Sequence, residues 1–393
     1  MINGGYTSRS GTLPFRFKPS FRQIHQRLVM PRLNRPDVVL LLATATLIGL
    51  GVVMILNASY FYGQEHYHDP FRFLRKHLAY LGVGLIAAAA ISRLRLEWYE
   101  RATYWILAFS FLSLVLVLIP PIGVVRGGAR RWINLGALSF QPAEFAKIAL
   151  VMYLARSIVR KREHMGEFVR GILPHLVIVG LAVGLILRQP DFGTATILLM
   201  LLILMLHAGG ARFRQLALLG LAGVPFVIYE IFKAHYRTQR LLCFMDPWDY
   251  SQNCGFQLVQ SLIAFGSGGI SGVGLGDSQQ KLFFLPEAHT DFIFALVGEE
   301  LGLWGVVAVL VLFAIVGIRG FRIAIRHPDP FASLLAFGLT LVIMLEAVIN
   351  IGVVTGLLPT KGLALPFLSY GGSSLIGTML QIGMLSALSR MTG

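Results

Sequence analysis

The stretch LPEAHTDFIFALVGEE, residues 285–300, runs directly into an apolar segment at residues 301–318. His289 and Asp291 stand where the polar part of this stretch meets the apolar part, and a Glu-Glu pair lies two turns farther on. An apolar run of this length is typical of a helix that crosses a membrane. Acidic side chains are rare inside a bilayer and usually mark a site there. The stretch therefore predicts a membrane protein that does chemistry or transport at a membrane face.

The whole chain has the composition of a polytopic membrane protein. Hydrophobic residues make up 55% of its 393 residues and charged residues 13%, whereas soluble domains have about 25% charged residues. Apolar runs of about 20 residues recur along the chain, and backbone groups in lipid must pair within their own element, so these runs are predicted to be helices. We predict an all-α fold with ten transmembrane helices, at residues 38–57, 77–92, 102–120, 142–158, 172–188, 193–207, 215–232, 291–317, 331–356 and 366–388.

The distribution of basic residues predicts the orientation of the chain. With a cytoplasmic N-terminus, the cytoplasmic segments carry 21 of the 34 Lys and Arg residues, as the positive-inside rule requires. An even number of spans then places both termini in the cytoplasm and a large outer loop, residues 233–290, between the seventh and eighth helices. Residues 1–37 are basic and lack an apolar period, which indicates a flexible cytoplasmic tail. Residues 38–393 are predicted to form one transmembrane domain.

The net charge of +15 has a simple explanation, because cationic cytoplasmic loops meet anionic lipid headgroups. The basic residues are divided among short loops, which argues against a nucleic-acid partner. The chain has no P-loop, no Rossmann glycine pattern and no His-Glu-x-x-His motif, so ATP-driven and nicotinamide chemistry are not indicated. Cys243 and Cys254 both lie in the outer loop, where their spacing permits a disulfide without requiring one.

Two outer segments combine polar residues with helix ends. Residues 126–141 (RGGARRWINLGALSFQ) contain three arginines and Trp132. Arginine recognises phosphate oxygens in bidentate fashion, although a loop whose arginines meet lipid phosphates is the alternative that the residues alone favour. In residues 189–194 (QPDFGT), Asp191 is either a helix N-cap or a second functional carboxylate.

Two further outer segments precede helices. Residues 255–291 contain an apolar period at 256–265, which suits a short interfacial helix, and a Gly-rich turn at 266–276. Residues 358–374 (LPTKGLALPFLSYGGSS) place Lys361 between two prolines, and Ser369 and Ser373 follow in a Ser/Gly run. Close packing of helices on small residues is the alternative explanation of that run.

Polar residues also occur inside the predicted helices. Glu144 and Lys147 are spaced i,i+3, and Glu346 and Asn350 are spaced i,i+4, so each pair shares a helix face. Such pairs either line a polar cavity or form an internal structural ion pair. Most of this polarity lies in the outer half of the helices, which favours a site open to the outer leaflet.

Asp291 is the candidate general base of this site. The alternatives are that Asp291 or Thr290 caps the eighth helix, and that His289, which titrates nearer neutrality, is the base. A lipid-linked sugar diphosphate fits this arrangement, because its sugar lies at the outer face and its tail in the membrane. Its diphosphate leaving group needs positive charge, which a divalent ion or the cations Arg126, Arg130, Arg131 and Lys361 would supply.

The motifs RRWINLG with FQPAEFAK, QPDFGTA, GFQLVQSLIAFGSGG, LPEAHTDFIFALVGEELG and LLPTKGLALPFLSYGGSS occur in this order. On these motifs the chain, from about Asp37 to Leu388, resembles the SEDS family (shape, elongation, division and sporulation), and its cell-division branch most. The resemblance implies ten transmembrane helices and an inverting glycosyltransferase of the cytoplasmic membrane at the division septum. That enzyme polymerises lipid II into β-1,4-linked glycan strands for peptidoglycan and releases undecaprenyl diphosphate.

The resemblance also implies roles for individual residues. The catalytic aspartate of the family falls on Asp291, which would deprotonate the acceptor GlcNAc 4-hydroxyl. Arg131, Lys147 and Lys361 would stabilise the donor diphosphate, with Mg²⁺ or Mn²⁺ as a candidate cofactor. The residues expected to bind substrate are Arg131, Trp132, Glu144, Lys147, Asp191, His289, Lys361, Ser369 and Ser373. Phe283 departs from the family pattern, since many division members have an acidic residue there, and the cysteine pair is not a family feature.

The partners that the resemblance implies are a class B penicillin-binding protein (FtsI), which crosslinks the strands, and the division proteins FtsQ, FtsL and FtsB. Two other functions stay open. A lipid II flippase would need polar residues through the full membrane depth. This function stays possible because the predicted helices contain Glu299, Glu300 and Glu346. A non-catalytic scaffold that recruits the crosslinking enzyme is the other.

Overall fold

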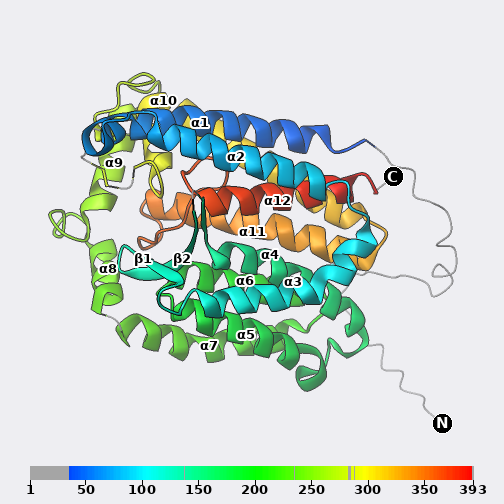
Figure 1. The fold of residues 1–393 in the computed structure, drawn as a ribbon. Coiled ribbons are helices and arrows are strands. Elements are labelled where there is room, and N and C mark those ends of the chain that lie inside the picture. The colour runs from blue at the N-terminus through cyan, green and yellow to red at the C-terminus, as the bar shows by residue number, and fades with distance from the viewer. Residues whose placement is uncertain (1–34, 137, 234, 282–284, 287, 392–393) are drawn as a thin grey trace, which may run out of the picture.

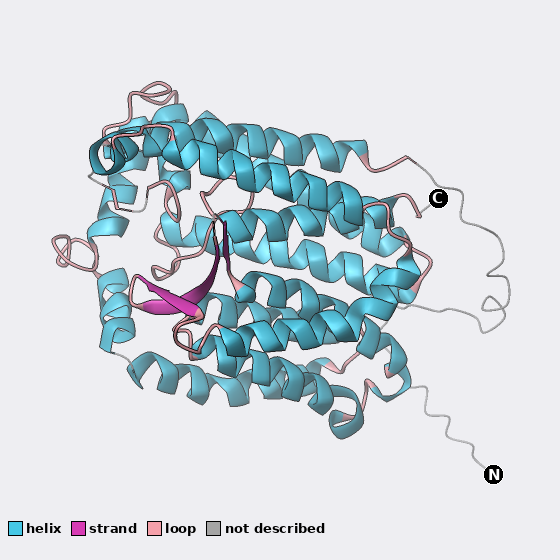
Figure 2. Cartoon of the chain, viewed as in Figure 1, coloured by secondary structure: helices cyan, strands magenta, loops and turns pink. Residues whose placement is uncertain are grey.

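The computed structural model describes residues 35–391 apart from 137, 234, 282–284 and 287. It is a bundle of helices with one small sheet near one end (Figures 1 and 2). Most of the predicted tail (residues 1–34) and Phe283 lie outside the described residues. The α-helices are α1 (Val38–Tyr67), α2 (Arg72–Ile91), α3 (Leu96–Leu116), α4 (Pro142–Arg160), α5 (Leu173–Leu187), α6 (Phe192–Ala208), α7 (Phe213–Lys233), α8 (His235–Met245), α9 (Phe256–Gly268), α10 (Ile293–Arg326), α11 (Pro330–Val354) and α12 (Gly372–Ser389).

Each of the ten predicted spans overlaps one of these helices, and α8 and α9 are additional helices of the outer loop. Six of the helical segments in the described residues are long and apolar enough to cross a membrane, and α6 is a shorter apolar helix. The chain is therefore a mostly helical polytopic membrane protein, while the crossing of all ten helices stays a prediction. Helix α9 occupies the position of the predicted interfacial helix and extends to Gly268.

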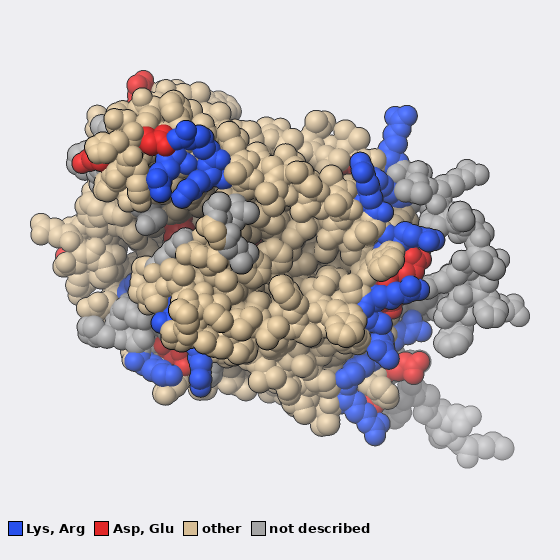
Figure 3. Space-filling model, in the orientation of Figure 1, with Lys and Arg blue, Asp and Glu red and all other residues tan. Residues whose placement is uncertain are grey.

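The start of α1 and the end of α12 lie at the same end of the bundle (Figure 1). The Asp37 N–H donates to Ser389 Oγ at 3.1 Å, and Arg319 on α10 forms an ion pair with the Asp37 carboxylate at 2.7 Å. Lys and Arg gather at the two ends of the face in view, with a broad uncharged band between them (Figure 3). This distribution is the one expected of a protein whose middle lies in lipid.

The segment at residues 126–141, predicted as a loop, contains strands, so the otherwise all-α fold carries one small sheet. Strands β1 (Gly123–Arg126), β2 (Ala129–Leu135) and β3 (Leu138–Phe140) form an antiparallel sheet in the order β1-β2-β3. Gly127 and Gly128 both have positive φ and form the two-residue turn between β1 and β2, the turn that best matches the twist of a hairpin. The strands are too short and too charged to be recognised from hydrophobic pattern.

Helix α10 is broken at Gly302 (φ 62°, ψ −158°), although the sequence predicts one continuous span there. The segment after α9 enters the break. Val273 N–H donates to the Glu299 carbonyl at 3.0 Å, and Leu303 N–H donates to the Gly269 carbonyl at 3.0 Å. These bonds satisfy the backbone groups that the break releases, which a helix in lipid requires. A Cβ at Gly302 would lie 2.3 Å from Gly272 N, so only glycine fits this crossing.

Candidate functional site

Asp291 lies just before α10. The N-cap position of α10 is Phe292, whose side chain makes no capping hydrogen bond. The Asp291 carboxylate faces the backbone of Gly362, where a Cβ would lie 2.9 Å from Asp291 Oδ2. Asn350 on α11 donates from Nδ2 to the Asp291 carbonyl at 2.8 Å and also to the Leu363 carbonyl. One amide thus fastens the segment of Asp291 to that of Lys361.

Lys361 lies beside the start of α6. Its Nζ donates to Thr196 Oγ1 at 3.4 Å and lies 4.8 Å from the centre of the Phe192 ring. Burial lowers the pKa of Lys361, and the negative charge of Asp191 opposes this by raising it. Asp191 also caps α6, accepting from the Thr194 N–H at 3.1 Å and the Thr194 hydroxyl at 2.9 Å. Asp191 is therefore the N-cap of α6, and its role as a second functional carboxylate stays a prediction.

Arg131 holds the turn that precedes Asp191. Its Nε donates to the Gln189 carbonyl at 2.9 Å, and a second guanidinium nitrogen donates to the Pro190 carbonyl. Trp132, the next residue on β2, is half-buried and pairs with Val124 of β1. The sheet therefore positions Arg131 against the α5–α6 turn.

Ser373 ties the start of α12 to the end of the sheet. Its hydroxyl accepts from the Gln141 N–H at 3.0 Å and donates to the Ser139 carbonyl at 2.8 Å. Ser369 accepts from the Leu365 N–H at 2.8 Å. Both predicted substrate-binding serines thus have backbone partners, and they shape the segments on either side of the site.

His289 belongs to a cluster of aromatic rings beside Asp291. Its ring centre lies 5.0 Å from that of Phe73, 5.7 Å from that of Tyr62 and 5.8 Å from that of Tyr370. Its carbonyl accepts from the Tyr370 N–H at 2.9 Å. Tyr62 and Phe73 come from the end of α1 and the start of α2, so their closeness to His289 could not be predicted from local sequence.

Glu144 and Lys147 form the expected pair, and Glu346 joins them. Lys147 Nζ lies 2.8 Å from Glu144 Oε2 and also contacts Glu346 Oε1. The three residues are 8%, 2% and 3% exposed, and Glu346 lies one turn of α11 from Asn350. Two carboxylates already balance the Lys147 charge, so the geometry favours the internal ion pair for Lys147 over a contact with diphosphate.

Glu299 and Glu300 fasten the end of the outer loop to α10. The Glu299 carboxylate accepts from the Ser278 hydroxyl and from the Gln279 N–H at 3.0 Å. Glu300 accepts from Asn57 of α1 at 3.0 Å and lies 3.8 Å from Lys281 Nζ. Both carboxylates therefore have partners that hold protein segments together.

Two further expectations concern the outer loop and a metal. A disulfide joins Cys243 and Cys254, whose Cα atoms are 5.9 Å apart. Among the described residues no group of three or more His, Cys, Asp or Glu side chains could hold a metal ion. The contacts of the Asp291 segment described above come from the Asn350 amide and the Gly362 backbone, and they add no carboxylate to form a site for Mg²⁺ or Mn²⁺ held by protein ligands alone.

Comparison with solved structures places this fold among proteins of cell-wall synthesis. A chain of a peptidoglycan synthase complex that coordinates polymerization and crosslinking matches with a TM-score of 0.75 and 28% identity, covering 91% of this chain and 98% of that chain. The rod shape determining protein RodA of Thermus thermophilus matches with a TM-score of 0.67 and 29% identity, covering 90% and 97%.

Sequence relatives agree with this placement. The probable peptidoglycan glycosyltransferase FtsW of Geobacter metallireducens is 43% identical over 368 residues, 93% of this chain and 98% of the relative. Stage V sporulation protein E of Bacillus subtilis is 41% identical over 355 residues, 90% and 97%. The sequence model of the FtsW/RodA/SpoVE family, described as cell cycle proteins, matches residues 38–393. The chain therefore belongs to the FtsW/RodA/SpoVE family, the same group that its motifs indicated.

Proposed function

We propose that this protein is a peptidoglycan glycosyltransferase of cell division that polymerises lipid II at the outer face of the cytoplasmic membrane. One observation carries the proposal. Polar segments far apart in the sequence meet around Asp291, through Asn350, Gly362 and Lys361. The sheet and the α5–α6 turn join the same assembly through Arg131. The named activity of its relatives supports this function.

Asp291 is the general base of the proposed reaction. Its carboxylate takes the proton of the acceptor GlcNAc 4-hydroxyl, and that oxygen forms a bond to the anomeric carbon of the donor. The bond from this carbon to the diphosphate breaks, and the configuration inverts. The backbone of Gly362 and the amide of Asn350 hold the Asp291 segment in place, so the carboxylate is positioned before substrate arrives.

Lys361 is the cation proposed to meet the departing diphosphate. Burial disfavours its charged form, and this lowers its pKa. A diphosphate nearby would restore the charged form, so ligand and lysine stabilise each other. Arg131 acts by positioning the α5–α6 turn beside Lys361, and it has more N–H donors than the two that this turn occupies.

The proposed orientation puts the end that carries Asp291 outside the cytoplasm and both chain termini inside. It requires that all ten predicted helices cross the membrane. A class B penicillin-binding protein is the proposed partner at the septum, because a structural relative belongs to a complex that couples polymerization to crosslinking.

The test is polymerisation of lipid II by the purified complex with that partner. Asp291→Asn should lower the rate at least about 100-fold, since a positioned general base contributes about 10²–10⁴. Asp246→Asn, at an exposed position of the outer loop, is the matched control and should keep the rate. A normal rate in Asp291→Asn would show that the base lies elsewhere.

The two remaining functions give different results. A flippase would move lipid II across liposome membranes in wild type and lose this in Asp291→Asn, without forming glycan strands. A scaffold would support division in cells that carry Asp291→Asn. Either outcome would replace the proposed activity.

A further inference from the structure

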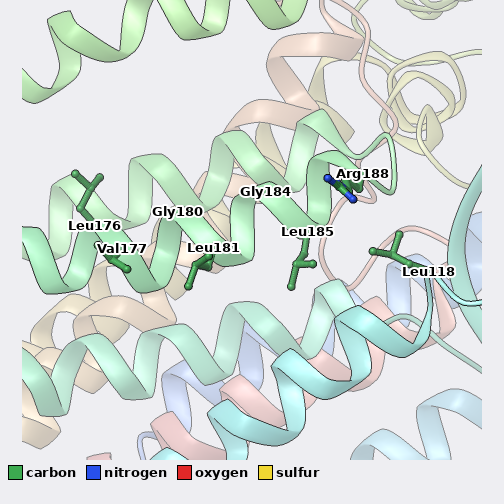
Figure 4. A pocket seen from close by; sticks show the side chains of 8 residues that line it. All are labelled: Leu118, Leu176, Val177, Gly180, Leu181, Gly184, Leu185 and Arg188. Atoms are coloured by element: carbon green, nitrogen blue, oxygen red, sulfur yellow. The ribbon is translucent and has the colours of Figure 1, made fainter.

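An open apolar groove of about 580 Å³ runs along α5. It is lined by Leu118, Leu176, Val177, Gly180, Leu181, Gly184, Leu185 and Arg188. Leu181 and Leu185 point from α5 into this groove, and Arg188 and Leu118 lie together at one end (Figure 4). A Cβ at Gly180 or Gly184 would meet nothing within 4 Å. The groove is open at these two positions because glycine has no side chain to fill it.

Three arginines gather at the end that Arg188 marks. Arg188 is exposed at the C-cap of α5. Arg131 bonds the carbonyls of Gln189 and Pro190, which directly follow Arg188. Arg130 donates to the Leu118 carbonyl at 3.2 Å, on the other wall of the groove, and its Nε is buried without a partner among the described residues. The apolar groove therefore ends in a concentration of positive charge.

We infer that this groove holds the hydrocarbon chain of the lipid-linked diphosphate donor, with the diphosphate at Arg188; the inference rests on the proposed function and adds a binding site to it. The chemistry of the groove matches that of the ligand from end to end. Leucine and valine face the polyprenyl chain, and guanidinium groups face the phosphates. The α5–α6 turn then leads from Arg188 to Asp191, whose charge acts on Lys361.

The charge at one end of the groove favours a lipid-linked diphosphate over a helix of a partner protein. The stretch from Leu176 to Arg188 spans about 18 Å at 1.5 Å per residue, a length that either occupant could cover. An apolar wall that ends in guanidinium groups fits an occupant with an apolar body and a single anionic end.

The groove is tested by filling it. Gly184→Leu places a side chain in open space, so the fold should be kept, and Gly49→Leu makes the same change on an exposed face of α1 that is also open. Each variant, in complex with the partner, is assayed with lipid II and with a short-tailed analogue that carries the same sugars and diphosphate. We expect Gly184→Leu to raise KM about tenfold for the long-tailed substrate and to leave KM for the analogue unchanged. Gly49→Leu should change neither value.

The charged end is tested separately. Arg188→Gln should raise KM for both substrates, since both carry the diphosphate, and Arg188→Lys should restore part of the loss. An unchanged KM for lipid II in Gly184→Leu, or an equal change for both substrates, would overturn the inference.

A binding experiment separates this inference from the proposed activity. A polyprenyl diphosphate with a photoreactive tail should label α5 and be displaced by unlabelled polyprenyl diphosphate. Phosphatidylglycerol vesicles and inorganic diphosphate should not displace it. Displacement by phosphatidylglycerol to the same extent would identify an ordinary lipid contact and overturn the inference. If a complex that makes no glycan is still labelled on α5, the inferred lipid site is supported and the proposed polymerase activity is rejected.

Discussion

Lys361 is held by the Thr196 hydroxyl and the Phe192 ring in a place where burial lowers its pKa. An ammonium group in such a place is poorly solvated, so it gains more from a passing anion than an exposed lysine would. In the proposed function Lys361 would therefore report diphosphate binding. Its charge depends on pH below the ordinary lysine pKa of about 10.4.

The rate at low substrate concentration should therefore fall as pH rises through the lowered pKa of Lys361, because the deprotonated amine no longer attracts the diphosphate. Lys361→Arg should remove this alkaline fall, since arginine stays charged up to a pH of about 12. Lys76→Arg, at an exposed site, is the control and should keep the wild-type profile. The measurement is kcat/KM against pH, and an alkaline fall that survives in Lys361→Arg would assign it to another group.

Unfolding of the protein at high pH does not explain the expected alkaline fall in kcat/KM. Because the folded state has the lower lysine pKa, it binds fewer protons than the unfolded chain between that pKa and about 10.4. This group therefore makes the free energy of unfolding rise with pH in that window, opposite to the expected change in activity.

At the scale of elements, the break in α10 depends on one glycine. Gly302 has φ 62°, and the segment after α9 approaches so closely that a Cβ would meet Gly272 N at 2.3 Å and the Ile270 carbonyl oxygen at 2.6 Å. A side chain there would have to strain the backbone or push the loop segment out of the break.

Gly302→Ala should destabilise the protein by about 1–3 kcal/mol, the usual cost of a strained backbone conformation, and lower its melting temperature in detergent. Gly266→Ala, on α9, adds a Cβ that meets nothing within 4 Å and serves as the control. Equal melting temperatures for Gly302→Ala and the wild type would mean that α10 can straighten without loss.

The sheet and the break show what sequence pattern predicts and what it does not. Apolar runs located the helices because burial in lipid imposes length and composition on each span. The strands of four, seven and three residues offer too few positions for a period, and Gly302 is one glycine among 42. Its positive φ comes from the neighbouring loop, which local sequence does not reveal.

At the scale of the whole molecule, a buried ion triad joins α4 to α11. Lys147 is 2% exposed and lies between Glu144 and Glu346. Removal of the cation would leave two carboxylates together without a counter-charge. Breaking a buried pair in this way costs far more than breaking an exposed one.

Lys147→Met should destabilise the bundle by about 3–5 kcal/mol, measured as loss of the folded protein on heating or in denaturant. Arg75→Met breaks the exposed pair with Asp69 and should cost about 0–1 kcal/mol. A loss in Lys147→Met as small as that in Arg75→Met would show that the two glutamates are neutralised by other means.

The residues of the candidate site were proposed from the sequence, whereas their connections could be predicted only in part. Asp291, Lys361 and Asp191 stood out because charges are rare in this chain. Their neighbours come from distant segments, and Ser373 reaches Ser139 across 234 positions of sequence. Such contacts depend on how the helices pack, so Asn350 as the link to Asp291 and Glu346 as a partner of Lys147 emerged only from the structure.

The break at Gly302 has a mechanical meaning for Asp291. A continuous helix behaves as a stiff rod, so a tilt at its far end would reach the aspartate undiminished. Here the first turns of α10 are bonded to the segment after α9, through Val273 and the carbonyl of Glu299. Asp291 is therefore supported by the outer loop, through these bonds, and by the Asn350 amide of α11. Its position depends on these two neighbours as well as on the remainder of its own helix.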